Sequence, residues 1–255
     1  MTETAFARPP IGLALRSLLR ADTIVLLRST VATVLSLVLP IVILIATTLG
    51  KAGSRLGSPA IIIGLALTLG LITSCLLGYS LTLAHDREVG VLQRLRVSPA
   101  PTWTIMTSRL CVQIASNLIA SIIVVTVGAA LHGLTPSPGQ YALALAVAVL
   151  GAAMFLSIGQ ALVALVPSTT AINAIGRILF VILVLLGLVG SSGILGDTMK
   201  SIAAWSPVGA LMTLFSDALT GAGWADQDGY ALIACLGYVV VFAFLGIRWF
   251  RWETH

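Results

Sequence analysis

The chain has 255 residues, of which 58% are hydrophobic and only 9% are charged. Roughly a quarter of the residues of a soluble domain are charged, so this composition excludes a water-soluble fold and indicates a chain whose main solvent is lipid. The net charge is +5, but no basic stretch is long enough to follow a nucleic-acid backbone. We interpret it as the basic flanks of membrane spans, which set their orientation.

Residues 1–28 come before the first long apolar run and contain several arginines. Ile11 and Leu15 recur with helical spacing against Arg16 and Arg20. This pattern predicts a basic amphipathic helix on the inner face of the membrane. A secretory signal places its apolar region earlier and keeps it shorter, so we expect the first span to be retained as an anchor.

Six apolar runs follow, each long enough to cross a bilayer, which needs about 20 residues. They are Ser29–Leu49, Pro59–Ala84, Ile105–Leu131, Tyr141–Val166, Ile172–Leu195 and Tyr230–Trp249. Backbone groups in lipid must pair internally, so each run is predicted to be helical. The sequence therefore predicts an all-α membrane protein, residues 1–255 forming one bundle of six transmembrane helices with no soluble domain.

The basic residues lie unevenly in the segments between these runs. Of the 14 Lys and Arg residues, all but Lys51, Arg55 and Lys200 fall on the side that holds both termini. Cytoplasmic segments carry the excess of Lys and Arg. We therefore predict a multi-pass protein of the cell membrane with both termini in the cytoplasm.

Residues 196–228 form an extracytoplasmic excursion before the last span. Most of the acidic residues of this excursion lie near its two ends. Its apolar piece, Pro207–Phe215, is too short to span a bilayer. Two arrangements remain open for it. It lies at the outer interface, or it dips inward as a re-entrant element shielded by protein.

No motif of a known enzyme site occurs in the chain. The phosphate loop GxxxxGK[ST], the zinc motif HExxH and the nucleophile motif GxSxG are all missing from the sequence. His85, His132 and His255 are not spaced as metal ligands, and the three cysteines are far apart in apolar runs. Acidic residues are almost absent from the spans, which argues against a proton-coupled transporter or an ion pump.

The most informative segment is residues 85–99, between the second and third runs, with the sequence HDREVGVLQRLRVSP. Acidic residues at its start and arginines at its end complement a helix dipole, and Pro99 ends the helix. Val89, Leu92 and Leu95 form an apolar ridge framed by charges. The pattern predicts a short cytoplasmic helix whose ridge requires a partner or the membrane surface.

Residues 87–99 resemble the signature of type-2 ABC exporter permeases, in which the second span is followed by charged residues, a glycine, a leucine-rich turn and a proline. Two positions depart from the common form: Val91 stands where Thr or Ser is usual, and Gln93 where Glu is frequent. The resemblance extends over nearly the whole chain through the six spans, the amphipathic N-terminal helix and the excursion before the last span.

This resemblance implies half of a channel built from two permeases, the second being another copy or a paralogue. Cytoplasmic ABC ATPase subunits would bind ATP and magnesium, so this chain would hold no cofactor, no metal and no catalytic residue and would not itself be an enzyme. Residues 85–99 would be the coupling helix that docks on the ATPase. The docking residues are predicted to be Arg87, Glu88, Gly90, Leu92, Arg94 and Leu95.

The implied function is outward transport of a hydrophobic or amphipathic substrate such as a drug, an antibiotic or a lipid. The small size of the chain is most similar to that of drug and antibiotic efflux permeases. Four polar residues in the spans are candidates for the substrate pathway, although such residues also serve at helix contacts. They are Thr68, Thr73, Ser74 and Asn173.

Two other functions stay open from the residues alone. One is an integral membrane transferase that uses Asp86, Glu88 and the arginines of residues 85–99 as a polar site, although two carboxylates are few for a metal site. The other is a secondary transporter with inverted repeats. Within the segment, Gly90 either approaches the docking groove closely or marks a local irregularity of the helix. Glu88 and Arg94 pair either with the ATPase or with each other.

Overall fold

The computed structural model describes residues 11–28, 30–49, 58–91, 94, 102–190, 196–221, 223 and 225–249. Every regular element in this part of the chain is helical. The helices are α1 (Ile11–Arg28), α2 (Thr30–Leu49), α4 (Pro59–Leu71), α5 (Tyr79–Glu88), α7 (Thr102–His132), α8 (Pro138–Leu165), α9 (Thr169–Leu185), α10 (Asp197–Trp205), α11 (Pro207–Thr220) and α12 (Asp226–Trp249). Two π-helical segments, η1 (Ile72–Gly78) and η2 (Leu186–Gly190), continue α4 into α5 and extend α9.

Five described helices are long and apolar enough to cross a membrane, or six if the bent pair α10–α11 is one span. These five are Pro59–Glu88, Trp103–His132, Pro138–Leu165, Thr169–Leu188 and Asp226–Trp249. They coincide with five of the predicted runs, and the chain is therefore a multi-pass membrane protein. The remaining predicted run, Ser29–Leu49, coincides with α2, whose segment Leu37–Leu49 is an apolar helix.

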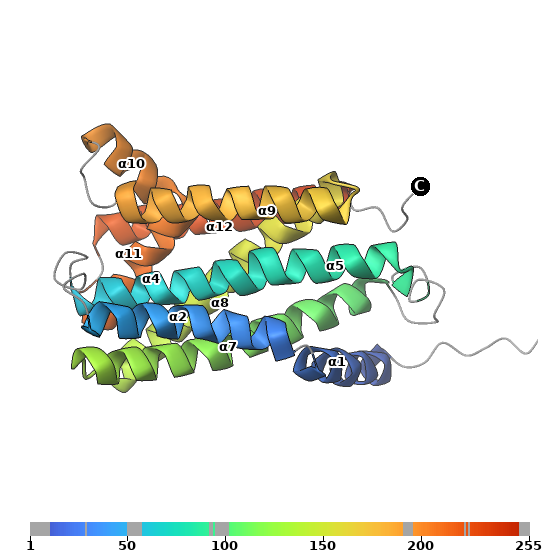
Figure 1. Ribbon diagram of the computed structural model, residues 1–255, viewed down its shortest axis with the longest axis horizontal. Coiled ribbons are helices and arrows are strands. Elements are labelled where there is room, and N and C mark those ends of the chain that lie inside the picture. The colour runs from blue at the N-terminus through green and yellow to red at the C-terminus, as the bar shows by residue number, and fades with distance from the viewer. Residues whose placement is uncertain are drawn as a thin grey trace, which may run out of the picture.

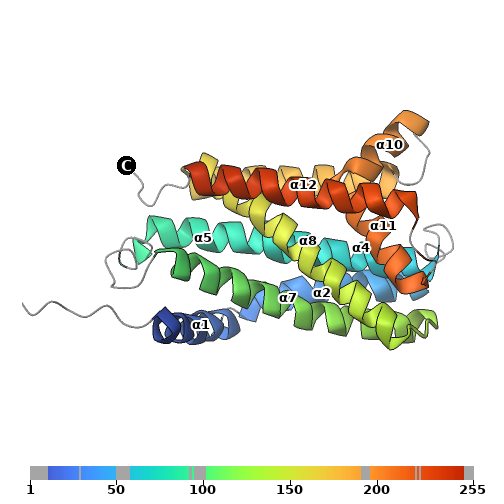
Figure 2. The same cartoon turned by 180° about the vertical axis from the view of Figure 1, so that it is seen from behind.

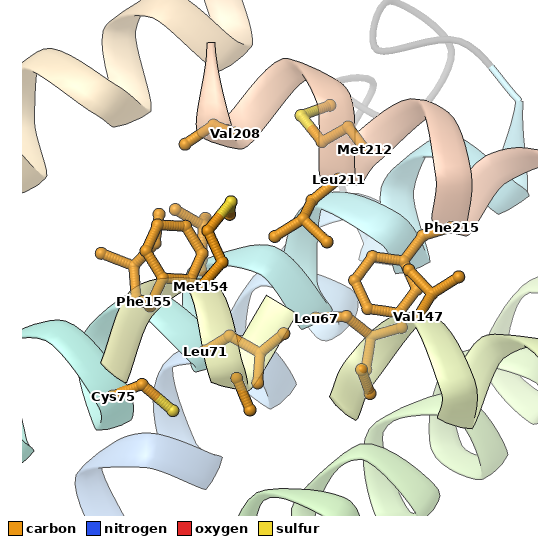
Figure 3. Close-up of a cluster of buried hydrophobic side chains, with 14 of the residues drawn as sticks. Leu67, Leu71, Cys75, Val147, Met154, Phe155, Val208, Leu211, Met212 and Phe215 are labelled. Carbon is orange, nitrogen blue, oxygen red and sulfur yellow. The ribbon is translucent and has the colours of Figure 1, made fainter. Parts of the chain in front are cut away.

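The continuous helix α4–η1–α5 is the centre of the bundle. About 78% of its most apolar stretch is buried, against 17–22% for the corresponding stretches of α7, α9 and α12. Apolar side chains of α4 and η1 pack against apolar side chains of α8 and α11, as Figure 3 shows. The outer helices instead expose leucines, isoleucines and valines, which is the pattern of surfaces that face lipid or another membrane chain.

Helix α11 is buried, although its sequence is too short to span a bilayer. The chain bends by 80° between α10 and α11, and α11 then packs against α4, α8 and α12. Ser206 caps α11 by accepting a hydrogen bond from the amide of Gly209 at 3.1 Å, and Pro207 occupies the first turn, where its missing N–H is harmless. Helix α11 is therefore shielded by the surrounding helices, and its re-entrant or interfacial position in the membrane stays a prediction.

The two ends of the bundle differ in their helices. In Figures 1 and 2 the long helices lie lengthwise, whereas α1 is seen nearly end-on and so runs across one end of the bundle. The C-terminal ends of α5 and α12 lie at this same end, and α10 lies at the other. Helix α1 packs mainly on α7 and exposes Ile11, Leu13 and Val25, as an amphipathic helix at an interface does.

Candidate functional site

Segment 85–99 begins as the end of α5 and breaks at Gly90. The amide of Val89 donates to the His85 carbonyl at 3.0 Å, and the amide of Gly90 donates to that of Arg87 at 3.3 Å. Gly90 then adopts a φ of +73°, which a glycine tolerates and other residues rarely do. The amide of Arg94 donates back to the Gly90 carbonyl at 3.1 Å. Helix α5 therefore does not continue regularly through Gly90, and this glycine marks a local irregularity of the helix, one of the two roles that the sequence left open.

Arg87 points into the protein and holds the end of α8. Its Nη1 donates to the carbonyl of Val163 at 2.6 Å, and its Nη2 donates to the carbonyls of Val166 and Pro167 at 2.8 Å each. The last carbonyls of a helix have no partner within the helix and carry partial negative charge. A planar guanidinium satisfies several of them at once, so Arg87 caps α8 although it is 76 to 80 residues distant in sequence.

Glu88 caps the start of α9, as Arg87 caps the end of α8. One of its carboxylate oxygens accepts a hydrogen bond from the amide of Thr169 at 3.1 Å, in the first turn of the helix, where the backbone amides favour an anion. Ser168 caps the same turn. We call Arg87 and Glu88 the Arg–Glu clamp, because these adjacent residues hold opposite sides of the α8–α9 turn, residues 166–168.

The predicted docking residues are thus divided by the fold. Arg87 is only 3% exposed. Glu88 and Arg94 are accessible at the surface, as is Val89 of the apolar ridge. The carboxylate of Glu88 bonds the amide of Thr169 rather than Arg94. Leu92 and Leu95 lie outside the described residues. No local pattern of residues indicates that Arg87 turns inward, because its partners are backbone carbonyls at the end of a distant helix.

The four predicted pathway residues have different hydrogen-bond partners and degrees of burial. Thr68 is fully buried and donates to the Gly64 carbonyl at 2.8 Å, and Thr73 donates to that of Leu69 at 2.8 Å. Both hydroxyls therefore bond the preceding helical turn. Ser74 accepts a hydrogen bond from the Gln113 amide at 2.8 Å across to α7. Asn173 is half-buried on α9.

A cavity of about 310 Å³ lies between α1, α5 and α7, and Ser74 lines it. We call it the α1 cavity. Its polar lining residues are Asp22, Ser74, Tyr79, Thr82, Asp86, Arg109, Gln113 and Ser116. The guanidinium of Arg109 pairs with the Asp86 carboxylate at 2.5 Å, and the Ser108 hydroxyl donates to Asp22. Sequence reasoning missed this cavity, because its charged residues come from three segments far apart in the chain.

Burial also affects the ionisation of Asp22. Its partial burial raises the pKa of the carboxyl above the ordinary value, and this effect outweighs the opposing hydrogen bond from Ser108 and the nearby charge of Arg109. The cavity therefore holds an acid whose ionised form is not fully compensated by the protein.

The comparisons with known proteins identify the family. The model of the ABC-2 type transporter family matches residues 14–220. The chain belongs to the ABC-2 type transporter family. It is therefore a membrane subunit of an ABC transporter, a class whose ATPase activity resides on separate ABC ATPase subunits with which the permease associates. A comparison with curated proteins gave no match.

The matched region of this ABC-2 permease runs from α1 to the end of α11. It includes the Arg–Glu clamp, the α1 cavity and the buried helix α11. Membership also decides against the transferase and the secondary transporter, which the residues alone left open.

Proposed function

We propose that this chain forms half of an ATP-driven export channel and that segment 85–99 is its docking element for the ATPase. The observation that supports this most is the Arg–Glu clamp. It joins the segment to the α8–α9 turn through four hydrogen bonds. A displacement of the segment by a closing ATPase would move α5, α8 and α9 together.

In this mechanism each part of the segment has its own role. Arg87 and Glu88 hold the segment from the protein side, Gly90 sets the change of direction, and the surface beyond Gly90 contacts the ATPase. Val89, whose side chain is 53% exposed, and Arg94 belong to that contact surface, together with Leu92 and Leu95 of the predicted ridge. Arg87 would thus support docking without touching the ATPase.

The end of the bundle that carries α1 and this segment would face the cytoplasm, in agreement with the distribution of basic residues. A second permease copy or a paralogue would complete the channel. The exposed apolar faces of α7, α9 and α12 provide surface for such a partner. The substrate would be a hydrophobic or amphipathic compound such as a drug, an antibiotic or a lipid, carried outward.

A pull-down from native membranes in mild detergent tests this proposal. The tagged wild-type chain is expected to retain a stoichiometric ABC ATPase, and Val89→Asp and Leu92→Asp to lose it, because a buried unpaired carboxylate opposes an apolar contact. Met199→Asp is the matched control, since Met199 is a partly exposed apolar residue on α10 at the opposite end. Robust ATP hydrolysis by the isolated chain, or ATPase retention by both aspartate variants, would contradict the proposal.

A further inference from the structure

The α1 cavity has polar groups that its own walls leave without partners. Two carboxylates, Asp22 and Asp86, face one guanidinium, that of Arg109, which pairs with Asp86. Among the described residues, Asp22 therefore has a hydroxyl donor, Ser108, but no ion-pair partner. The wall therefore has one more carboxylate than guanidinium groups, and this carboxylate is available to a cation.

The same wall offers hydrogen-bond donors without acceptors. The Tyr79 side chain is only 6% exposed, and its hydroxyl has no hydrogen-bond partner in the described part of the chain. Nε of Arg109 is also buried and has no hydrogen-bond partner in the described part of the chain. A buried polar group without a partner is destabilising, so these groups indicate that a ligand or water completes them. The complementary ligand carries a cation for Asp22 and an oxygen acceptor close to it.

The remaining surface of the cavity is apolar. Val25, Leu26, Leu83 and Val112 contribute to its walls. Val25 is also 61% exposed, and its sequence neighbour Ile24 is exposed as well. An apolar chain that leaves the cavity along α1 would thus remain in contact with apolar side chains.

We propose that the α1 cavity binds an amphiphile whose headgroup carries a primary ammonium next to an oxygen acceptor. The ammonium pairs with Asp22, the oxygen accepts from Tyr79 and Arg109, and the apolar chain lies along α1. This headgroup chemistry occurs both in a membrane lipid, phosphatidylethanolamine, and in single-chain amino alcohols. The site concerns binding alone and stands independently of the docking proposal.

Titration of the purified full-length chain with two fluorescent probes tests the site. One probe is phosphatidylethanolamine labelled on its acyl chain, and the other is labelled sphingosine, a single-chain amino alcohol; anisotropy reports binding. Asp22→Asn keeps an oxygen for the Ser108 hydroxyl but removes the charge. We expect it to weaken binding about tenfold, the effect of one charge-assisted hydrogen bond. Tyr79→Phe is expected to weaken binding about threefold.

Two controls distinguish a built site from lipid that simply surrounds the protein. Asp226→Asn removes an exposed carboxylate in the first turn of α12 and is expected to bind as the wild type does. Phosphatidylcholine with the same label has no N–H donor and is expected to bind at least about fivefold more weakly. Tighter binding of one probe identifies the source of the headgroup. Equal binding by Asp22→Asn and wild type, or by the two phospholipids, would overturn the proposal.

Discussion

Arg87→Met is expected to produce the largest loss of stability of any single side-chain change among the described residues of segment 85–99. The methionine fills a similar volume but leaves the carbonyls of Val163, Val166 and Pro167 without their donors. Hydrogen bonds to a charged group contribute about 1.5–3 kcal/mol each, and unpartnered buried carbonyls are destabilising in addition. We expect the free energy of unfolding to fall by about 3 kcal/mol or more, with loss of coupling between ATP hydrolysis and transport.

The melting temperature of the solubilised chain, monitored by size-exclusion chromatography after heating, measures this effect. Arg94→Met is the matched control, because Arg94 is exposed just beyond Gly90; its melting temperature is expected to stay within a few degrees of wild type. Arg87→Lys is expected to be intermediate, since an ammonium lacks the fork that reaches several carbonyls. Equal melting temperatures for Arg87→Met and Arg94→Met would rule out the Arg–Glu clamp as a structural tie.

Gly209→Ala is expected to prevent correct formation of the corner between α10 and α11. An added Cβ would overlap the carbonyl oxygen of Ala203 and would lie 2.7 Å from its carbon. Both are backbone atoms, so no side-chain rotation relieves the overlap, and the 80° bend must open. Because α11 packs in the core, opening the bend displaces Leu211 and Phe215 as well. Overpacking commonly costs 1–3 kcal/mol, and here we expect about 3 kcal/mol or more.

The readout is the yield of monodisperse protein and its melting temperature. Gly237→Ala in α12 is the matched control, since a Cβ there meets nothing within 4 Å. It is expected to be neutral or slightly stabilising, because alanine favours a helix by up to about 1 kcal/mol over glycine. Wild-type yield and stability in Gly209→Ala would show that the corner is not as tight as described.

The family resemblance carried by residues 87–99 was confirmed by the match over residues 14–220. The assignment of individual residues to docking and to the substrate pathway stays a prediction. For Thr68 and Thr73 the structure supplies the alternative that the sequence had left open, a bond to the preceding turn. Ser74 is the pathway candidate that the fold places in the lining of the α1 cavity.

The membrane class, the all-helical fold and the positions of five of the six predicted spans follow from the sequence alone. These depend on local composition, because about 20 apolar residues are needed to cross a bilayer and lipid forces each such run to be helical. An irregularity at Gly90 was one of two alternatives that the sequence left open, and the positive φ there favours glycine.

The contacts of these residues depend on the packing of distant helices. The sequence places Arg87 among the predicted docking residues, and the structure shows that its guanidinium caps α8 through the carbonyl of Val163, 76 residues later. The α1 cavity collects Asp22, Asp86 and Arg109 from three helices, and α11 is buried although it is too short to span a bilayer. The physical reason is the same in each case. Partners of buried polar groups and space around a glycine are set by segments distant in the chain, and no local pattern of residues records them.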